Sequence, residues 1–288
     1  MILGLDIGSK NCKSNKKIIF DSSVLEGDEI SKDGIKLILN NKHYIIGSDY
    51  GLKNMDINKA SRDNSLPLLY TLIGMSVVST EVENYIVVGL PIGQYLKKRR
   101  DYRDYILDNA IANFKLNNVN RSIIIKDCIV QPEGLSSVAN DYNGIVLDIG
   151  GRTIDICLII NKKIIKPTSI PNGTLNLYSN IIDAINNEYS LDLMLTDAER
   201  IIENGLTIYG EKQNTSIVND CINIYIKDIV NKLKLEYSLS THNLLCVGGG
   251  SKTLFKYIKK EIPHAGIVED PLFSNAIGFA RIGEAFWH

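Results

Sequence analysis

Short apolar segments alternate along this chain with longer segments in which apolar residues recur at helical spacing. The short segments predict strands over residues 2–7, 85–89, 121–130, 146–149, 154–160 and 244–247, with return strands at 16–20 and 163–168. The longer segments predict helices over 66–79, 95–114, 173–185, 196–204, 217–238, 254–262 and 274–286, and a shorter one over 135–140. Residues 22–46 predict further strands, with Asp33-Gly34 as a hairpin turn between 29–30 and 35–39. This pattern is typical of an α/β protein.

The strands predicted at 2–7 and 146–149 both end in Leu-Asp-Ile and are both followed by glycine, so that the chain contains the sequence Leu-Asp-Ile-Gly twice. In each copy the aspartate, Asp6 or Asp148, precedes a glycine-containing turn and a second β-rich run, which predicts a hairpin whose tip can approach a ligand closely. Glycine allows successive N–H groups to point toward one anion. A carboxylate beside a polyphosphate requires a cation between them, so we expect Asp6 and Asp148 to hold Mg²⁺ through water. Simple turn chemistry explains one such copy, but two copies favour a pair of phosphate loops.

Composition and charge exclude several other classes of protein. The chain has 288 residues, 44% of them hydrophobic, which is enough for one large core or two medium ones. A net charge of -1 provides no basic field for direct binding to nucleic acid or to an anionic membrane, so a role on DNA would need an adaptor. The five cysteines are scattered and form no C-x-x-C pair, which indicates reduced thiols in a cytoplasm. No run of about 20 apolar residues is present to span a bilayer, and 2–7 is too short for a secretory signal.

Three further turns carry candidate chemistry. Pro132 removes backbone freedom beside Glu133, which would be held at a strand end and could also cap the helix that follows. Gly173 opens a predicted helix whose amino end could face phosphate. Gly248-Gly249-Gly250-Ser251 lies between a strand and a helix, where backbone without side chains can lie flat against a nucleoside. It is not a P-loop, because a serine separates the last glycine from the lysine.

Together these motifs resemble the actin, Hsp70 and sugar-kinase superfamily of two-lobed ATPases. Asp6 to Lys13 is similar to its first phosphate loop, Asp148 to Asp155 to its second, and Leu244 to Ser251 to its adenosine motif. Within the superfamily the chain looks like the bacterial plasmid-segregating actins, the ParM-like proteins. Their pattern is echoed by Val88-Gly89-Leu90-Pro91-Ile92, Gln131-Pro132-Glu133-Gly134 and Asn275-Ala276-Ile277-Gly278-Phe279. These motifs span nearly the whole chain in the expected order.

The resemblance implies an actin-like ATPase fold, with two α/β lobes built from duplicated mixed-sheet domains around a nucleotide cleft. The first domain would comprise 1–145, including an outer subdomain insertion, and would be completed by 268–288; the second would comprise 146–267. Asp148 and Glu133 would be catalytic, because Glu133 matches the glutamate that orients or deprotonates the attacking water in ParM-like proteins. The residues expected to contact ATP or ADP are Gly8, Ser9, Asn11, Lys13, Gly150, Gly151, Arg152, Thr153, Gly173, Glu199, Glu203, Gly248, Gly249, Gly250 and Ser251.

Several of these residues allow a second interpretation. Lys13 matches the lysine that meets the β- and γ-phosphates, but it could be an ordinary exposed lysine. Arg152 replaces a small residue of many ParM-like members and could reach phosphate, reach the opposite lobe or point outward. Thr196 and Glu199 form a capping-box pattern, which we favour for Glu199, whereas family position suggests that Glu199 or Glu203 contacts ribose. The basic run 97–100 predicts a solvated helix face, the alternative being contact with an acidic patch on a neighbouring subunit.

The resemblance also implies a function. The expected protein is a cytoplasmic, bacterial ATP hydrolase that uses Mg²⁺ and polymerises into nucleotide-dependent filaments. It would segregate plasmid DNA through a DNA-binding adaptor at a centromere-like site, without contacting nucleic acid or membrane itself. The alternatives are a small-molecule kinase of the same superfamily and a nonpolymerising scaffold ATPase.

Overall fold

A computed structural model describes residues 1–27, 33–48, 51–53 and 64–288, and divides them into two compact units. Unit 1 comprises Met1–Ala139 and Phe273–His288, and unit 2 comprises Asn140–Leu272. The units are described separately below. The domain limits expected from the sequence remain a prediction, and the strand expected at 29–30 lies outside the described residues.

Unit 1 is built on a mixed sheet of ten described strands in the order β3-β2-β1-β8-β10-β9-β5-β6-β4-β7. Its centre is parallel, because β1 pairs with β8 and β8 with β10 in the same direction. Parallel strands end at the same edge of a sheet, so the carboxyl ends of these three strands lie together. The strands are β1 (Ile2–Ile7), β2 (Asn11–Ser14), β3 (Ile19–Asp21), β4 (Ser23–Glu26), β5 (Ile35–Leu39), β6 (Lys42–Ile46), β7 (Leu52–Lys53), β8 (Glu81–Leu90), β9 (Ile111–Leu116) and β10 (Val119–Pro132).

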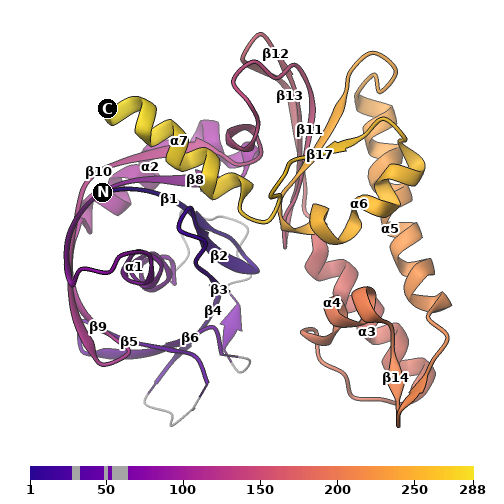
Figure 1. Cartoon of the computed structure of the whole chain (residues 1–288), viewed down its shortest axis with the longest axis horizontal. Coiled ribbons are helices and arrows are strands. Elements are labelled where there is room, and N and C mark those ends of the chain that lie inside the picture. The colour runs from indigo at the N-terminus through magenta and orange to yellow at the C-terminus, as the bar shows by residue number, and fades with distance from the viewer. Residues whose placement is uncertain (28–32, 49–50, 54–63) are drawn as a thin grey trace. The chain divides into compact units, whose positions relative to one another are not determined.

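The sheet of unit 1 curves around helix α1 (Ser65–Ser76), as Figure 1 shows. Alternate residues of the strands bury leucine, isoleucine and valine side chains against this helix, which forms one continuous core. Helix α2 (Ile92–Asp108) packs on β10, and the C-terminal helix α7 (Ser274–Trp287) packs on β1 and β8. The approach of α7 is close, because a side chain at Gly4 of β1 would overlap the backbone of Ala276. A one-turn helix, η2 (Leu135–Ser137), follows β10.

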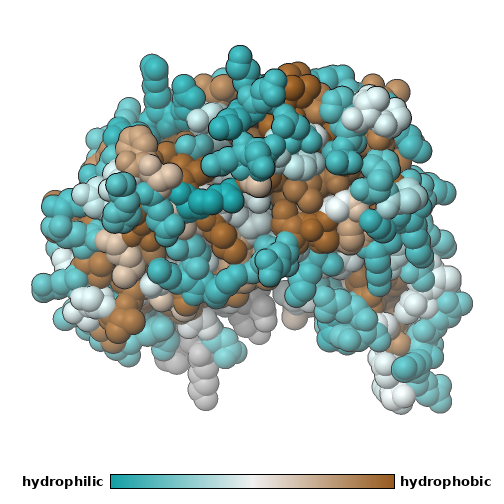
Figure 2. Space-filling view, turned by 45° about the horizontal axis from the view of Figure 1, so that its top comes forward, coloured by the Kyte–Doolittle hydropathy of each residue, from teal (hydrophilic) through white to brown (hydrophobic). Residues whose placement is uncertain are grey.

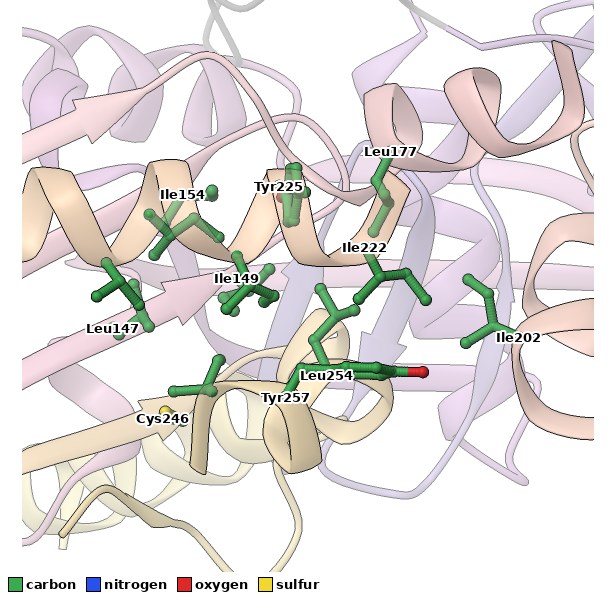
Figure 3. Packing of buried hydrophobic residues seen from close by; sticks show 14 of the residues in the cluster. Leu147, Ile149, Ile154, Leu177, Ile202, Ile222, Tyr225, Cys246, Leu254 and Tyr257 are labelled. Atoms are coloured by element: carbon green, nitrogen blue, oxygen red, sulfur yellow. The ribbon is translucent and has the colours of Figure 1, made fainter. Parts of the chain in front are cut away.

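Unit 2 contains a five-stranded sheet in the order β13-β12-β11-β16-β17 and a separate hairpin of β14 and β15. Its strands are β11 (Gly144–Ile149), β12 (Ile154–Ile160), β13 (Lys163–Ile170), β14 (Thr207–Ile208), β15 (Glu211–Lys212), β16 (Leu244–Val247) and β17 (Gly266–Ile267). Its helices are α3 (Thr174–Tyr189), α4 (Asp197–Asn204), α5 (Ser216–Glu236) and α6 (Gly249–Glu261). Figure 3 shows how Leu147 and Ile149 of β11, Tyr225 of α5 and Leu254 of α6 meet in the core between sheet and helices.

Several predicted elements have different limits in the structure. The return strand expected at 16–20 begins earlier, at Asn11, and a turn with Lys17 at a φ of 61° separates it from β3. The helix expected over 95–114 ends at Asp108, and residues 111–116 form β9 because their burial alternates with period two. The helix expected over 135–140 is only one turn long. Helix α6 starts at Gly249, within the glycine run, rather than after it.

Candidate functional site

In unit 1 the first predicted phosphate loop is a tight hairpin between β1 and β2. The two strands pair antiparallel with Ile7 opposite Cys12, and the N–H of Gly8 donates to the carbonyl of Asn11 at 3.1 Å. A side chain at Gly8 would come within 2.5 Å of that same carbonyl, so the turn requires glycine. Ser9 and Asn11 therefore lie on the tip and at its return, as the sequence predicts for donors to an anion.

Lys13 points to the carboxylate that the sequence assigns to the metal. Asp6 and Lys13 face each other across the hairpin, and the Lys13 Nζ lies 2.7 Å from the Asp6 Oδ2. The two side chains are only 6% and 11% exposed, so Lys13 is not an ordinary surface lysine. A buried ion pair of this kind keeps both groups charged and oriented. The hairpin thus presents one fixed cation and one fixed anion side by side.

Glu133 follows the last residue of β10 and lies at the same sheet edge as Asp6. Its N–H donates to the carbonyl of Leu90, which ends β8, at 2.9 Å. The next residue, Gly134, has a φ of 76°, and its N–H donates to the side chain of Asn275 at 2.8 Å. A side chain at Gly89 would come within 2.9 Å of the Glu133 Cγ, so the glutamate packs directly over β8. Both the strand end and α7 therefore hold Glu133 in place.

In unit 2 the second predicted phosphate loop repeats the first turn. The N–H of Gly150 donates to the carbonyl of Thr153 at 2.9 Å, which matches the bond between Gly8 and Asn11. Asp148 pairs with Asp155 across the hairpin, in the position where unit 1 has a lysine. Both carboxylates are buried at 5% exposure, and the Thr153 hydroxyl donates to Asp155 at 3.0 Å. The local repeat seen in the sequence is thus a repeat of backbone geometry.

The amino end of α3 is attached to the carbonyl side of this loop. The N–H groups of Gly173, Thr174 and Leu175 donate to the carbonyls of Arg152, Gly150 and Gly151, at 2.9 to 3.0 Å. A side chain at Gly173 would come within 2.5 Å of the loop backbone, so this contact also requires glycine. The helix amides that the sequence assigned to phosphate are therefore occupied by the loop itself.

This attachment determines where the loop amides point. In a trans peptide the carbonyl and the following N–H point in opposite directions, and the described backbone contains no cis bond. Because the carbonyls of residues 150, 151 and 152 face α3, the N–H groups of Gly151, Arg152 and Thr153 face away from it. Successive amides on one side of a turn form an anion-binding concavity. The loop can thus bind phosphate through its backbone whichever way the Arg152 side chain points.

Asp148 is positioned by the glycine run after β16. β11 and β16 are parallel neighbours with Asp148 beside Val247, and Gly248 has a φ of 83°. A side chain at Gly248 would overlap the Asp148 Oδ1. At Gly250 a side chain would come within 2.6 Å of both Ile149 and Thr174. The glycines therefore let α6 approach the loop and leave space for the Asp148 carboxylate.

The rest of the glycine run offers backbone rather than side chains. Gly249 is the first residue of α6, and a side chain there would meet Leu272 at 3.2 Å. Ser251 is fully buried, and its hydroxyl donates to the carbonyl of Val247 at 2.6 Å. Because that hydroxyl already donates to the end of β16, a ligand would contact this segment through the backbone of the glycines.

The two glutamates of α4 have different environments, and the capping-box prediction for Glu199 is wrong. Thr196 makes no side-chain capping bond. The Glu199 Oε1 instead accepts from the hydroxyls of Tyr178 at 3.4 Å and Thr253 at 3.5 Å, which joins α3, α4 and α6. Burial, with the Glu199 charge adding to it, raises the pKa of Tyr178, so its hydroxyl stays protonated as a donor. Glu203 is exposed, and the structure does not place it with Glu199.

The residues that sequence reasoning missed are the partners of the predicted ones. Asp155 pairs with Asp148, and Tyr178 and Thr253 hold Glu199. Asp155 had a visible signal, since it closes the second motif, whereas the contacts of Tyr178 and Thr253 join segments distant in the sequence. Across the described residues no group of three or more His, Cys, Asp or Glu side chains could hold a metal. A site with so few carboxylates fits Mg²⁺ that keeps several waters and is bound chiefly by substrate phosphates.

Two family models match the chain. Residues 4–135 match the N-terminal domain of actin-like proteins, and residues 146–260 match the C-terminal domain of the archaeal, MreB-like actin homologue. No curated protein matches the chain. No helix among the described residues has the length and apolar character to cross a membrane.

Solved structures of actin-like proteins share the fold. The archaeal actin homologue Ta0583 has a TM-score of 0.84 and 20% identity, with 99% of each chain covered. Its complex with ADP has a TM-score of 0.83 and 19% identity, again with 99% of each chain covered. The ParM of a 15-stranded filament from Clostridium botulinum has a TM-score of 0.81 and 21% identity, with 99% of each chain covered. The actin-like fold expected from the sequence is confirmed.

Proposed function

The chain belongs to the actin-like ATPase superfamily, and from this premise we propose that it binds and hydrolyses ATP and assembles into nucleotide-dependent filaments. The observation that carries the proposal is the loop after β11. Its carbonyls are bound by α3, and its amides point away from α3, which is the arrangement of an anion-binding turn. The ADP bound to an archaeal homologue and the filament formed by a ParM support the same assignment.

We assign separate roles to the residues of unit 1 and of unit 2. The loop amides of Gly151, Arg152 and Thr153 bind phosphate oxygens in unit 2, while Gly8, Ser9, Asn11 and Lys13 do so in unit 1. Asp6 and Asp148 would hold Mg²⁺ through water, and the metal would supply positive charge to the phosphates. Gly248, Gly249 and Gly250 offer a flat backbone to the nucleoside. Glu199, held by two hydroxyl donors, accepts from a ribose hydroxyl.

Glu133 is the proposed base or orienting group for hydrolysis. It accepts a hydrogen bond from water, which attacks the γ-phosphorus as the bond from phosphorus to the bridging oxygen breaks, releasing ADP and phosphate. Its N–H is bound to the end of β8, and the N–H of the next residue, Gly134, is bound to Asn275 of α7, so the backbone that carries the carboxylate is fixed on both sides. Rigid placement matters here because phosphoryl transfer depends mainly on positioning and charge.

The biological use that we propose is plasmid segregation in a bacterial cytoplasm. A net charge of -1 is unfavourable for direct binding to DNA, so the filament would act through a DNA-binding adaptor protein. The functional domains would be 1–145 with 268–288, and 146–267. The proposal for the adaptor is tested by pull-down of centromere-like plasmid DNA with and without the candidate adaptor.

Sedimentation with light scattering tests the proposed assembly. Purified protein with Mg²⁺ is measured with ATP, GTP, ADP or no nucleotide over a range of protein concentrations. Nucleotide-triggered sedimentation above a threshold concentration supports a filament. A protein that binds ATP but stays monomeric throughout contradicts it, and turnover that then requires a sugar identifies a kinase, whereas turnover insensitive to sugars identifies a scaffold ATPase.

A further inference from the structure

Helix α2 carries an exposed cationic surface that the proposed nucleotide site does not use. Leu96, Arg99 and Arg100 share one helix face, since they are three and four positions apart, and Lys97 adjoins them. Leu96 is 72% exposed, and the three basic residues are also exposed. The buried side of α2 is formed by Ile92, Tyr102 and Ile106. We call Leu96, Lys97, Arg99 and Arg100 the basic surface of α2.

Among the described residues, ion pairs neutralise little of this surface. Lys98 lies 3.8 Å from Asp101, and Arg103 further along α2 is bound to Asp127 at 2.8 Å. Within the part of the chain that the structure describes, Lys97, Arg99 and Arg100 have no ion-pair partner. Arg99 instead lies over the ring of Tyr95. Like charges in one helical turn repel each other, so an acidic partner would relieve a cost that the isolated molecule bears.

Unit 2 carries the opposite charge around α4 and the β14–β15 hairpin. Residues 188–212 contain six acidic and two basic residues. One acidic residue, Asp197, is paired with Arg200 at 3.0 Å, and a second, Glu199, turns inward. The other four, which are exposed and have no ion-pair partner among the described residues, are Glu188, Asp192, Glu203 and Glu211. We call these four residues, with Tyr209, the acidic tip.

Hydrogen bonds fix part of the backbone that carries the acidic tip. The side chain of Asn186 bonds the backbone of Leu193 in both directions, at 2.9 and 3.0 Å. The hydroxyl of Tyr189 donates to the carbonyl of Asn214 at 3.0 Å, which joins the end of α3 to the residues after β15. A surface fixed in this way loses little conformational entropy when it docks.

Tyr209 is the most exposed aromatic residue of the described chain. Its relative exposure of 102% means that the residue is fully accessible to solvent. Its φ of 49° is one that tyrosine rarely adopts. With Gly210 at a φ of 86° it forms the two-residue turn between β14 and β15, where asparagine is preferred at the first position. Figure 2 shows that one face of the molecule is mostly hydrophilic, with smaller hydrophobic patches between the polar side chains.

We propose that the acidic tip of one copy of this chain docks on the basic surface of α2 of a second copy. This proposal rests on the proposed function, because it specifies one subunit contact of the filament. Charge complementarity identifies the occupant: the chain carries both a cationic surface with an exposed leucine and an anionic one with an exposed tyrosine. The two surfaces differ, so the contact is heterologous, as a contact that propagates into an open filament must be.

Charge reversal on the full-length protein tests the proposal. The first variant carries Arg99→Glu and Arg100→Glu, the second carries Glu203→Lys and Glu211→Lys, and the third carries all four changes. The control, Lys227→Glu with Lys234→Glu, makes the same change of net charge as the first variant on exposed lysines of α5. Sedimentation with Mg²⁺ and ATP is measured for each variant beside the wild type, after circular dichroism and ATP binding have established that each is folded.

Each of the first two variants should raise the threshold concentration for sedimentation by about tenfold or more, while the control leaves it unchanged. The four-change variant, and a one-to-one mixture of the first two variants, should recover most of the lost assembly because the opposite charges meet again. Unchanged thresholds in the first two variants, or loss of assembly with no recovery in either combination, would overturn the contact. If the wild type itself fails to sediment, the proposed filament function fails, which is a separate result.

Discussion

At the scale of single residues, two glycines with nearly the same φ have different structural roles. Gly248 has a φ of 83° and would overlap the Asp148 carboxylate if it carried a side chain, whereas Gly210 has a φ of 86° and nothing within 4 Å. The first glycine is needed both for its conformation and for the space that it leaves. The second is needed for conformation alone. Substitutions at these two glycines therefore distinguish the effect of backbone strain from the effect of displacing Asp148.

We predict that Gly248→Ala abolishes nucleotide binding while Gly210→Ala preserves it. Both variants should lose about 1 to 2 kcal/mol of stability from the positive φ. Only Gly248→Ala also displaces Asp148. The measurements are chemical denaturation and the binding of a fluorescent ATP analogue. Equal affinities in the two variants would show that the position of Asp148 does not matter for the nucleotide.

Glu133→Gln should lower ATP turnover by about 10²- to 10⁴-fold, because the amide cannot accept a proton from the attacking water. Assembly with ATP should persist, and filaments should disassemble more slowly as ADP accumulates more slowly. The exposed Glu284→Gln in the same unit serves as the control. Phosphate release is measured together with sedimentation, and wild-type turnover in Glu133→Gln would exclude this residue as the base.

At the scale of elements, contacts among residues that are not assigned to nucleotide binding hold unit 2 together. Glu236 at the end of α5 is 2.6 Å from the Lys232 Nζ and accepts from the hydroxyl of Thr168 on β13 at 2.5 Å. Lys166 of β13 also donates to the Glu236 carbonyl at 2.6 Å. These bonds join the edge strand of the sheet to the longest helix of the unit. The hydrogen bonds from Lys232 and Thr168 lower the pKa of Glu236 below its ordinary value of 4.5.

This lowered pKa predicts an acid-sensitive contribution to stability. A carboxyl with a depressed pKa in the folded state stabilises the fold above its ordinary pKa and loses that stabilisation as the pH falls through the folded-state value. The contribution should be less than about 1 kcal/mol, because the group lies near solvent. Glu236→Gln should therefore reduce the loss of stability between pH 6 and pH 3.5 in urea denaturation. The exposed Glu261→Gln should leave that loss as in the wild type.

The β14–β15 hairpin offers a second prediction at this scale. Tyr209→Asn should stabilise the hairpin by up to about 1 kcal/mol, because asparagine tolerates a positive φ better than tyrosine. If the acidic tip is a subunit contact, the same change should weaken assembly even though it stabilises the monomer. Thermal unfolding and sedimentation are measured on the same preparation, with Leu235→Ala, which removes another exposed apolar side chain, as the control.

At the scale of the whole molecule, each unit has its own hydrophobic core, and each contributes residues to the proposed function. Unit 1 supplies Lys13 and Glu133, and unit 2 supplies the loop at Gly150 and the glycine run at Gly248. A ligand that binds only the folded protein stabilises it in proportion to the logarithm of its excess over Kd. Nucleotide binding should therefore be visible in the stability of the chain as a whole.

ADP at about one hundred times its Kd, with Mg²⁺, should stabilise the protein by about 2.7 kcal/mol and raise its Tm by a few degrees. Removing Mg²⁺ with EDTA should reduce this shift, since Asp6 and Asp148 would then face the phosphates without a cation. Differential scanning fluorimetry measures both shifts. A Tm increase that survives EDTA unchanged would show that the metal plays no part in ADP binding.

The sequence by itself determined the features that depend on local pattern. The two Leu-Asp-Ile-Gly segments predict the paired hairpins, because an apolar run, a turn residue and a second run are local signals. Their order along the chain, with the glycine run after residue 247, carries the resemblance to actin-like proteins. The pairing of Asp6 with Lys13 does not follow from the sequence, which predicts the return strand at 16–20 rather than from Asn11.

Only the tertiary structure decided which groups meet. Glu199 looks like a capping residue in its own helix, yet it bonds side chains from two other helices. The amides at the start of α3 look free for phosphate, yet the loop at Gly150 takes them. Residues 111–116 share a helical spacing with α2, but pairing with β10 makes them a strand. In each case a partner outside the element satisfied a hydrogen-bonding group, and the pattern of the element itself contains no information about such partners.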